Sequence, residues 1–277
     1  NVTSPEDVNN QYGADILPLW VVGSDYSDDL RIGPDIIKSQ ADVYRRMRNT
    51  MRYLLGNLDN FQDSERLDFA QMPELERWVL HRLWATAKQV KKACNDFHFH
   101  PLFSELNNFC TVELSALYFD IRKDTLYCER EDSTLRRACR TVLDEIFNCL
   151  TAWLAPFICF TAEEGWLARN PDGQSVHQRL FPDVPEEWQD DALAAKWTKV
   201  RELRRVVTGA LEIERAEKRI RSSLQATPKV YVTSEYIAAL SGVDLAEIAI
   251  TSGAQLIEAD VPEGAFTSPD VEGVGVV

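Results

Sequence analysis

The spacing of apolar residues constrains the fold of this 277-residue chain more than any other feature. As far as Ser223, apolar side chains recur every three or four positions, which is the spacing of one face of an α-helix. The clearest run, residues 35–58, places on one face Val43, Met47, Met51, Leu54 and Leu58. Comparable runs occupy residues 74–94, 103–118, 135–154, 160–167 and 191–223. Because each amphipathic helix must bury its apolar stripe against another, the pattern predicts an antiparallel helical bundle.

After Pro228 the hydrophobic period shortens from about 3.6 residues to 2. Residues 229–233 alternate like a strand, and residues 235–240 suit a short helix. We expect residues 245–259 to form two strands that turn at Ser252-Gly253. The predicted fold class is therefore mainly α, an antiparallel helical bundle followed by a small α/β module that we expect to be truncated at Val277.

The first 34 residues differ from the bundle. Ser4-Pro5-Glu6-Asp7 predicts a helix start, with an N-cap, a proline at the first helical position and acids in the first turn. A loop rich in Asp and Gly then extends from Gly23 to Pro34. We expect three parts: a connector over residues 1–34, a helical domain over 35–225 and the start of the α/β module over 226–277.

The formal net charge of −14 argues against nucleic-acid binding through bulk electrostatics. Such binding requires that the basic residues gather on one surface. No apolar run approaches the roughly 20 residues that span a bilayer, so we expect no membrane partner. The six cysteines form no C-x-x-C pair, so we expect no zinc site. We expect free thiols in the core and a reducing, cytoplasmic setting.

The first candidate binding surface lies on the helix predicted for residues 35–58. Arg45, Arg48, Asn49 and Arg52 share a face opposite the apolar stripe. Guanidinium groups in a row suit bidentate binding of phosphates. No arginine of this row has an acid four residues on, so we expect no local pairing. The alternative is a solvated face, or arginines paired with acids of neighbouring helices.

The second candidate surface lies on the next helix, where Trp84 stands among the cations Arg77, Lys88 and Lys92 and the imidazole of His81. A large aromatic ring amid cations can stack on an unpaired base. The alternative places Trp84 at the edge of the core.

The third candidate surface is a stripe on the long helix after residue 190. Glu212 lies within the stripe, and its pairing with Arg215 is the alternative to nucleic-acid binding. The arginines of the stripe are Arg201, Arg204, Arg205, Arg215 and Arg219.

Signals for catalysis are weak. His98 and His100 lack a third ligand at metal-binding spacing, so we expect them to be buried or to cap a helix. Glu163 and Glu164 are neighbours in a predicted helix and so do not face each other. The chain has no G-x-G-x-x-G and no phosphate-binding loop. We expect no catalytic residue, no metal ligand and no cofactor in this chain.

Several segments, in order along the chain, resemble the isoleucyl-tRNA synthetases, a family of class I aminoacyl-tRNA synthetases. They are NVTSPEDVNNQYGADILPLWVVGSDYSDDLRIG, YRRMRNTMRYLLGNLDNF, FCTVELSALYFDIRKDTLY, LAPFICFTAEEGW, VHQRLFP and ALEIERAEKRIRSSLQA. The LAP…FTAEE segment is shared with the valyl and leucyl sister enzymes, whereas the RNT…LLGNL and DIRKD runs indicate isoleucine. Two positions depart from the family pattern: Pro18 stands where Arg is usual, and Gly165 where Ile or Val is usual.

The resemblance implies that this chain is the part of such a synthetase that follows the KMSKS signature and contains the anticodon-binding domain. The parent enzyme would attach isoleucine to its tRNA with ATP and Mg²⁺, its catalytic and editing domains would precede Asn1, and a zinc module would follow Val277. The chain alone would be inactive. Its partners would be the anticodon stem-loop of isoleucine tRNA and the missing domains of the same chain, and we expect a monomer. The expected tRNA-contacting residues are Arg45, Arg48, Asn49, Arg52, Arg77, Trp84, Lys88, Lys92, Arg201 and Arg205.

A competing hypothesis from another class is a helical scaffold or protein-docking module that touches RNA little. The acidic net charge favours it. The two hypotheses differ in salt dependence, since phosphate binding weakens steeply with added salt and apolar docking does not.

Overall fold

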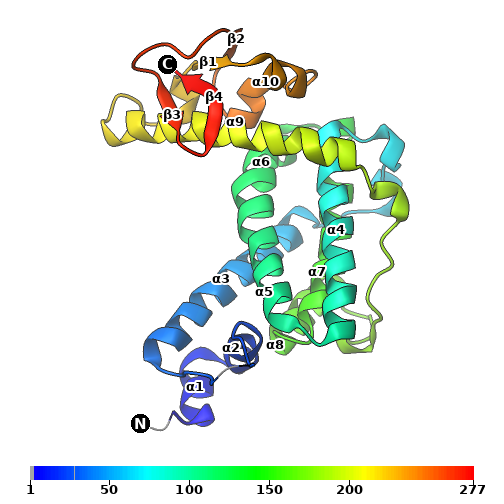
Figure 1. Ribbon diagram of the computed structural model, residues 1–277. Helices are drawn as coiled ribbons and strands as arrows, with labels where there is room; N and C mark the ends of the chain where they lie inside the picture. The colour runs from blue at the N-terminus through cyan, green and yellow to red at the C-terminus, as the bar shows by residue number, and fades with distance from the viewer. Residues whose placement is uncertain (1–2, 28) are drawn as a thin grey trace. The chain divides into compact units, whose positions relative to one another are not determined.

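The computed structural model describes residues 3–27 and 29–277. Two compact units make up the chain, Asn1–Gln189 and Asp190–Val277. The first unit is helical (Figure 1) and contains, in order, α1 (Pro5–Tyr12), α2 (Ile16–Val22), α3 (Pro34–Asn57), η1 (Asp63–Glu65), η2 (Phe69–Gln71), α4 (Glu74–Asp96), α5 (Phe99–Asn108), η3 (Phe109–Tyr118), α6 (Phe119–Cys128), α7 (Thr134–Leu154), α8 (Cys159–Arg169), η4 (Val176–Gln178) and η5 (Glu186–Trp188).

Helix α7 forms the centre of the first unit. It packs against α3, α4, α6 and α8, and nearly every side chain from Ala138 to Leu154 is buried. A helix buried around most of its circumference belongs in a core rather than at a surface, and the charged side chains of α7 need partners there. Three of the six free thiols are buried, Cys139 and Cys149 on α7 and Cys110 on η3, as expected for cysteines that act as small core residues.

The segments α5, η3 and α6 join into one uninterrupted rod (Figure 1). Its middle, η3, is a π-helix, in which hydrogen bonds span five residues instead of four. Accordingly the amide of Phe119 donates to the carbonyl of Leu114, and the Ser115 hydroxyl donates to the carbonyl of Cys110 at 2.7 Å. The sequence predicted a helix only over residues 103–118, so the rod is longer than expected.

A buried ion pair joins α4 to α6. Arg122 Nε donates to Glu76 Oε1 at 2.6 Å and Arg122 Nη2 to Glu76 Oε2 at 3.1 Å. Their side chains are 4 % and 0 % exposed. The Tyr118 hydroxyl also donates to Glu76 Oε1, at 3.2 Å. Each charge therefore has a partner, without which burial in the core would be strongly unfavourable.

The start of the chain packs on the helical bundle of the first unit. Val8, Ile16, Ile37 and Ala41 form a cluster that joins α1 and α2 to α3. The buried carboxylate of Asp15 accepts hydrogen bonds from the amides of Phe160 and Thr161 at 3.1 and 2.9 Å. These amides lie at the first turn of α8, where an anion is favoured by the unpaired N–H groups and the helix dipole.

The two departures from the family pattern have local explanations. Pro18 lies in the first turn of α2, where its missing N–H breaks no helical hydrogen bond. At Gly165 in α8, a Cβ would come within 2.8 Å of the Met51 methyl on α3. The glycine therefore permits a close approach of the two helices, which offsets its low helix propensity of roughly 1 kcal/mol relative to Ala.

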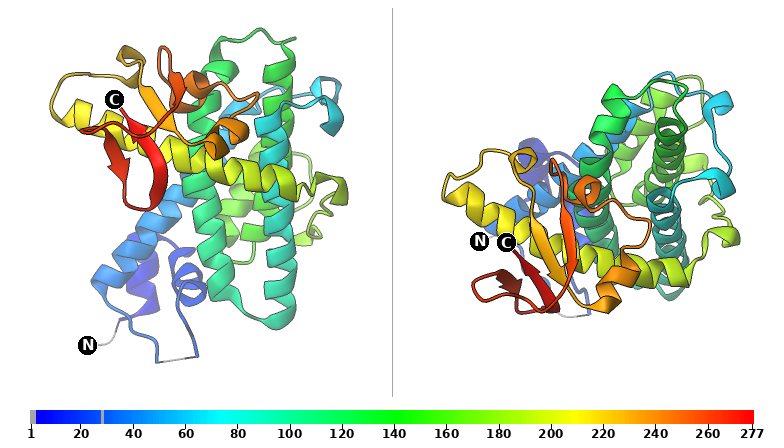
Figure 2. Two further views of the ribbon diagram at one scale, coloured as in Figure 1. Left: turned by 45° about the horizontal axis from the view of Figure 1, so that its top comes forward. Right: turned by 90° about the horizontal axis from the view of Figure 1, so that it is seen from above.

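The second unit combines one long helix with a small sheet. Its elements are α9 (Asp191–Ala216), η6 (Ser223–Gln225), β1 (Lys229–Val232), α10 (Ser234–Ala239), α11 (Leu245–Ala249), β2 (Gln255–Glu258), β3 (Phe266–Ser268) and β4 (Val271–Val276). The sheet order is β2-β1-β4-β3. Strand β1 is parallel to β2, with Val230 opposite Leu256, and antiparallel to β4, with Val230 opposite Val276. Helix α9 packs against β3 and β4 (Figure 2).

The predicted fold class, a mainly α bundle followed by a small α/β module, is confirmed, and within the described residues the strands all follow Pro228. The border between the two compact units lies at residues 189 and 190 rather than at 225, so α9, which packs against β3 and β4, falls in the second unit. The prediction of two strands over 245–259 was wrong in its first half. Asp244 accepts hydrogen bonds from the amides of Ala246 and Glu247 and so begins α11, and only β2 is a strand.

Helix α9 also ends earlier than the periodicity predicted, at Ala216 rather than Ser223. Lys218 adopts a left-handed conformation (φ 60°). The amide of Arg219 then donates to the carbonyl of Glu214 at 2.9 Å, which closes a Schellman-type end without glycine. No helix in the described part of the chain has the length and apolar character that crossing a bilayer requires.

The buried pair generates a stability prediction. Glu76→Ala leaves the Arg122 guanidinium uncompensated in the core, and we expect a loss of about 3–5 kcal/mol in the free energy of unfolding. Asp132→Ala removes an exposed partner, since Asp132 pairs with Arg130 at side-chain exposures of 69 % and 84 %, and should cost under about 1 kcal/mol. Urea unfolding of both variants measures the difference. Equal losses would contradict the assignment of Glu76–Arg122 as a core interaction.

Candidate nucleic-acid interface

The predicted row on α3 is exposed. The buried side chains of this helix, among them Met47, Met51 and Leu54, lie on one face and pack into the bundle. The opposite face carries Arg45, Arg46, Arg48, Asn49 and Arg52, all exposed. The helical spacing therefore located this face correctly, but Arg46, which lies one position off the strict three- and four-residue steps, was missed.

Two arginines of this face have acidic partners. Arg45 pairs with Asp42 at 2.7 Å, three residues earlier on the same helix, so the expectation of no local pairing was wrong for this residue. Arg48 lies 3.6 Å from Glu164 on α8. Both ion pairs are exposed, so water screens the attraction between their charges and each pair is weak. Arg46, Asn49 and Arg52 make no side-chain hydrogen bond or ion pair with the described residues, so their donors are available to a ligand.

The second predicted surface, on α4, is partly packed within the protein. Trp84 Nε1 donates to Glu186 Oε2 at 3.0 Å, and Lys88 donates to the other oxygen of the same carboxylate. The Lys88 ammonium also lies 5.3 Å from the centroid of the Trp84 ring. His81 is buried and Arg77 is half-buried, whereas Lys92 is exposed and Lys88, also exposed, is paired with Glu186.

Glu186 is held ionised by this arrangement. The hydrogen bond from Lys88, followed by the one from Trp84, holds the pKa of the Glu186 carboxyl below its ordinary value. A carboxylate beside the indole repels a phosphate and occupies the indole N–H. The geometry on α4 thus favours the alternative in which Trp84 lies at the edge of the packed structure.

The arginines of the third surface are mostly engaged within the second unit. Arg204 Nε donates to the carbonyl of Ile248 at 2.8 Å, Arg201 is half-buried, and Arg215 pairs with Glu212 as the alternative foresaw. Arg219 lies beyond the end of α9 and pairs with Glu214 and Glu217. Arg205 is exposed and makes no ion pair with the described residues.

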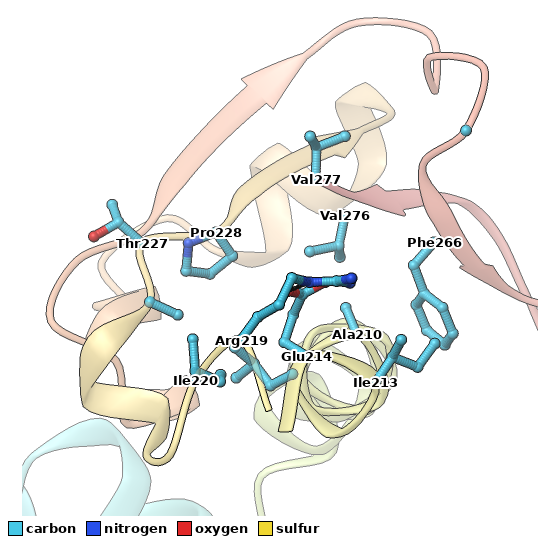
Figure 3. Close-up of a pocket in the computed structure, with 13 residues that line it drawn as sticks. Ala210, Ile213, Glu214, Arg219, Ile220, Thr227, Pro228, Phe266, Val276 and Val277 are labelled. Atoms are coloured by element: carbon cyan, nitrogen blue, oxygen red, sulfur yellow. Dashed lines mark hydrogen bonds and ion pairs between the residues drawn. The ribbon is translucent and has the colours of Figure 1, made fainter. Parts of the chain in front are cut away.

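A hollow of about 540 Å³ in the second unit lies beside this stripe (Figure 3). Its walls are mainly apolar, with Phe266 on one side and Val276 opposite α9. The guanidinium of Arg219 lies next to the carboxylate of Glu214. Because that ion pair is internally neutral, the hollow does not extend the basic stripe.

Of the weak catalytic candidates, the two glutamates have partners within the protein, and the expected buried or capping role does not hold for His98, which is exposed. Glu163 accepts a hydrogen bond from the amide of Val176 at 2.8 Å, and Glu164 lies beside Arg48. His98 precedes α5, and its side chain forms no capping hydrogen bond. Within the described ranges, His, Cys, Asp and Glu side chains form no group of three that could hold a metal.

Comparison with known proteins places the chain in a family. The model of the anticodon-binding domain of tRNA ligases matches residues 76–231, more than half of the chain. The isoleucine–tRNA ligase of Agrobacterium fabrum is 50 % identical over 277 residues, which is 100 % of this chain and 28 % of the relative. That of Caulobacter vibrioides is 47 % identical over 278 residues, again 28 % of its length. The chain thus spans less than a third of these relatives.

A solved structure shares the fold. The agnB2 LeuRS of Agrobacterium radiobacter K84, crystallised in a ternary complex with tRNA and LeuAMS, superposes with a TM-score of 0.52 at 16 % identity. The similarity covers 69 % of this chain and 22 % of that one. These comparisons confirm the resemblance inferred from the ordered segments, and the chain belongs to the family of anticodon-binding domains of tRNA ligases.

Proposed function

We propose that this chain is the tRNA-binding part of an isoleucine–tRNA ligase and that it holds the anticodon stem-loop. The observation that carries the proposal is the exposed row on α3, in a chain 50 % identical to part of ligases of that name. Its guanidinium groups lie about one helical turn apart, so that neighbouring phosphates of one RNA strand can each accept hydrogen bonds from them. Binding the stem-loop would position a distant acceptor end for the ligase.

The distribution of charge supports the α3 face over the other two. The chain as a whole is acidic, at −14, so only a local excess of cations can attract RNA. On α4 and α9 most of the predicted side chains are packed, hydrogen-bonded or paired within their own unit. On α3 two arginines and an asparagine lack such partners, and the two existing pairs are exposed and easily exchanged for phosphate.

The ligation chemistry would belong to other parts of a longer protein. ATP, Mg²⁺ and a zinc module are implied by the family, but the described residues offer neither a phosphate-binding loop nor a group of metal-ligating side chains. The residues present do not fit these groups. As part of the same proposal, the protein is a monomer and works in the cytoplasm.

A second candidate function is protein docking, which an apolar hollow near the start of the chain favours. Thr3, Pro5, Val8 and residues of α2 enclose an apolar hollow of about 490 Å³. Val21 and Ile32 on its rim are 41 % and 38 % exposed. Exposed apolar side chains gathered in one place are typical of an interaction surface. We assign this hollow to contact with the remainder of the longer protein, which is compatible with RNA binding on α3.

Reversing charge on α3 tests the RNA-binding proposal. Arg48→Glu and Arg52→Glu should each weaken binding of an isoleucine-tRNA stem-loop, and the slope of log affinity against log salt should become shallower by about one phosphate contact or more. Both residues are exposed, so the free energy of unfolding should change by under about 0.5 kcal/mol. Fluorescence anisotropy over a salt series measures the slope.

The matched control is Arg130→Glu, which makes the same charge change at an exposed, ion-paired arginine away from α3. Its affinity for the stem-loop should stay close to that of the wild type. Similar weakening in all three variants would indicate a general charge effect. Unfolding of the α3 variants, with salt-insensitive binding by the wild type, would show that these arginines are internal struts.

The purified chain should form no isoleucyl-adenylate and should charge no tRNA, because the nucleotide-binding signatures of such chemistry are missing from its sequence. Isoleucine-dependent exchange of radioactive pyrophosphate into ATP is the measurement. The full-length ligase of a close relative serves as the positive control. Exchange by the chain above the buffer level would refute this prediction.

A further inference from the structure

Helices α3 and α8 pack side by side and touch at three successive points. The contacts, in chain order, are Tyr44–Thr161, Arg48–Glu164 and Met51–Gly165. On both helices the contact residues advance toward the C-terminus, so the two helices run in roughly the same direction here. Because α3 carries the arginine row, the contacts that fix α3 against α8 also fix the direction of that row.

The first of these contacts belongs to a chain of hydrogen bonds that extends to α2. Thr161 Oγ1 donates to Asp15 Oδ2 at 2.7 Å. Because a threonine hydroxyl has one hydrogen and a carboxylate only accepts, the Tyr44 hydroxyl must be the donor to Thr161, also at 2.7 Å. Thr161 and Asp15 are each 6 % exposed, so water competes little for these bonds. We refer to Tyr44, Thr161 and Asp15 as the clamp.

The carboxylate of Asp15 binds α8 rather than its own helix. Asp15 is the N-cap residue of α2, a position at which aspartate usually accepts a hydrogen bond from the first turn of the helix that it starts, yet its side chain makes no such bond. Both oxygens instead accept from the start of α8, from the amides of Phe160 and Thr161 and from the Thr161 hydroxyl. The clamp thus joins the three helices α2, α8 and α3.

Of the three contacts between α3 and α8, the clamp alone combines a fixed direction with a buried acceptor. The second contact is an exposed, weak ion pair, and it would open when Arg48 binds a phosphate. The third contact is apolar and sets no direction. Successive residues of a helix differ by about 100° in direction, so the place of the Tyr44 ring determines where Arg45 and Arg48 leave the helix.

We propose that Tyr44, Thr161 and Asp15 are positioning residues for RNA binding, which set the rotation of α3 and thereby aim its arginine row at the phosphates of one strand. They act through α3 and not by touching the RNA. The inference rests on the proposed function and deepens it, because it names what holds the binding face in place. Donors that meet neighbouring phosphates must lie within roughly 0.5 Å of the productive geometry, which a helix free to rotate does not provide.

Removal of single hydroxyl groups tests the clamp. Tyr44→Phe and Thr161→Val each delete one hydroxyl and nearly keep the size of the side chain. Each should weaken binding of an isoleucine-tRNA stem-loop about 10-fold, as the loss of one charge-assisted contact does, and should make the slope of log affinity against log salt shallower by about one phosphate. Thr161→Ser, which keeps the hydroxyl, should bind like the wild type. A merely structural hydrogen bond would change the melting temperature but not the salt slope of the folded chain.

The matched control is Tyr236→Phe, which removes a tyrosine hydroxyl that donates to Glu202 at 3.0 Å in the second unit. Its affinity and its salt slope should equal those of the wild type. Fluorescence anisotropy at a temperature well below the melting transition of every variant measures both quantities, so that only folded chains are compared.

The outcomes separate this inference from the proposed function. If the wild type binds the stem-loop, and Tyr44→Phe and Thr161→Val bind it with the same affinity and slope, the clamp positions nothing and the inference is overturned. Binding by Thr161→Ser as weak as that by Thr161→Val would overturn it too, because the hydroxyl would then be irrelevant.

If the wild type binds no stem-loop, the proposed function fails, and amide hydrogen exchange of the free chain then tests the clamp. Exchange over residues 41–52 of α3 should be faster in Tyr44→Phe than in the wild type or in Tyr236→Phe. Faster exchange would support the clamp as the contact that holds α3 in place, and equal rates would overturn it.

Discussion

The candidate interface depends on the buried carboxylate of Asp144 in α7. Its two oxygens accept hydrogen bonds from Arg66, which follows η1, and from Arg169 at the end of α8, the latter at 2.5 Å. Arg66 also reaches Glu145 at 2.7 Å, and Arg169 donates to the carbonyl of Leu58 at 3.0 Å. One carboxylate in the central helix thus fixes the turn that leaves α3. At 3 % exposure its interactions are little screened, and loss of either arginine would leave charge buried.

An aromatic ring completes this arrangement. Phe61 lies in the same turn, and the guanidinium carbons of Arg66, Arg140 and Arg169 lie 5.4, 5.3 and 5.7 Å from its ring centroid. The ring separates three cations that would otherwise repel one another, and its π-face attracts each of them. Segments from α3, α7 and α8 are held together at this ring.

The fold was largely predictable from the sequence. Which arginines are paired within the protein and which stay exposed was not. Periodicity located α3 and α4 because burial of one face dominates the free energy of a long amphipathic helix. It misjudged α11, which has only five residues and is started by the side chain of Asp244. Spacing also gave α3 and α9 equivalent basic stripes. They differ because partners such as the carbonyl of Ile248 come from residues distant in sequence.

The acidic total charge was a poor guide to the interface, because exposed charges and neutralised charges count equally in a sum. What distinguishes the α3 face is the local lack of partners for Arg46 and Arg52, a property of the packed structure rather than of composition.

Hydroxyl-radical footprinting of the chain, with and without an isoleucine-tRNA stem-loop, measures most directly whether α3 is the RNA-binding face. The account predicts that peptides over residues 45–57 become protected on binding, while Trp84 on α4 keeps its reactivity. Protection confined to the apolar hollow around Val21, with the side chains of α3 as reactive as in the free chain, would contradict it.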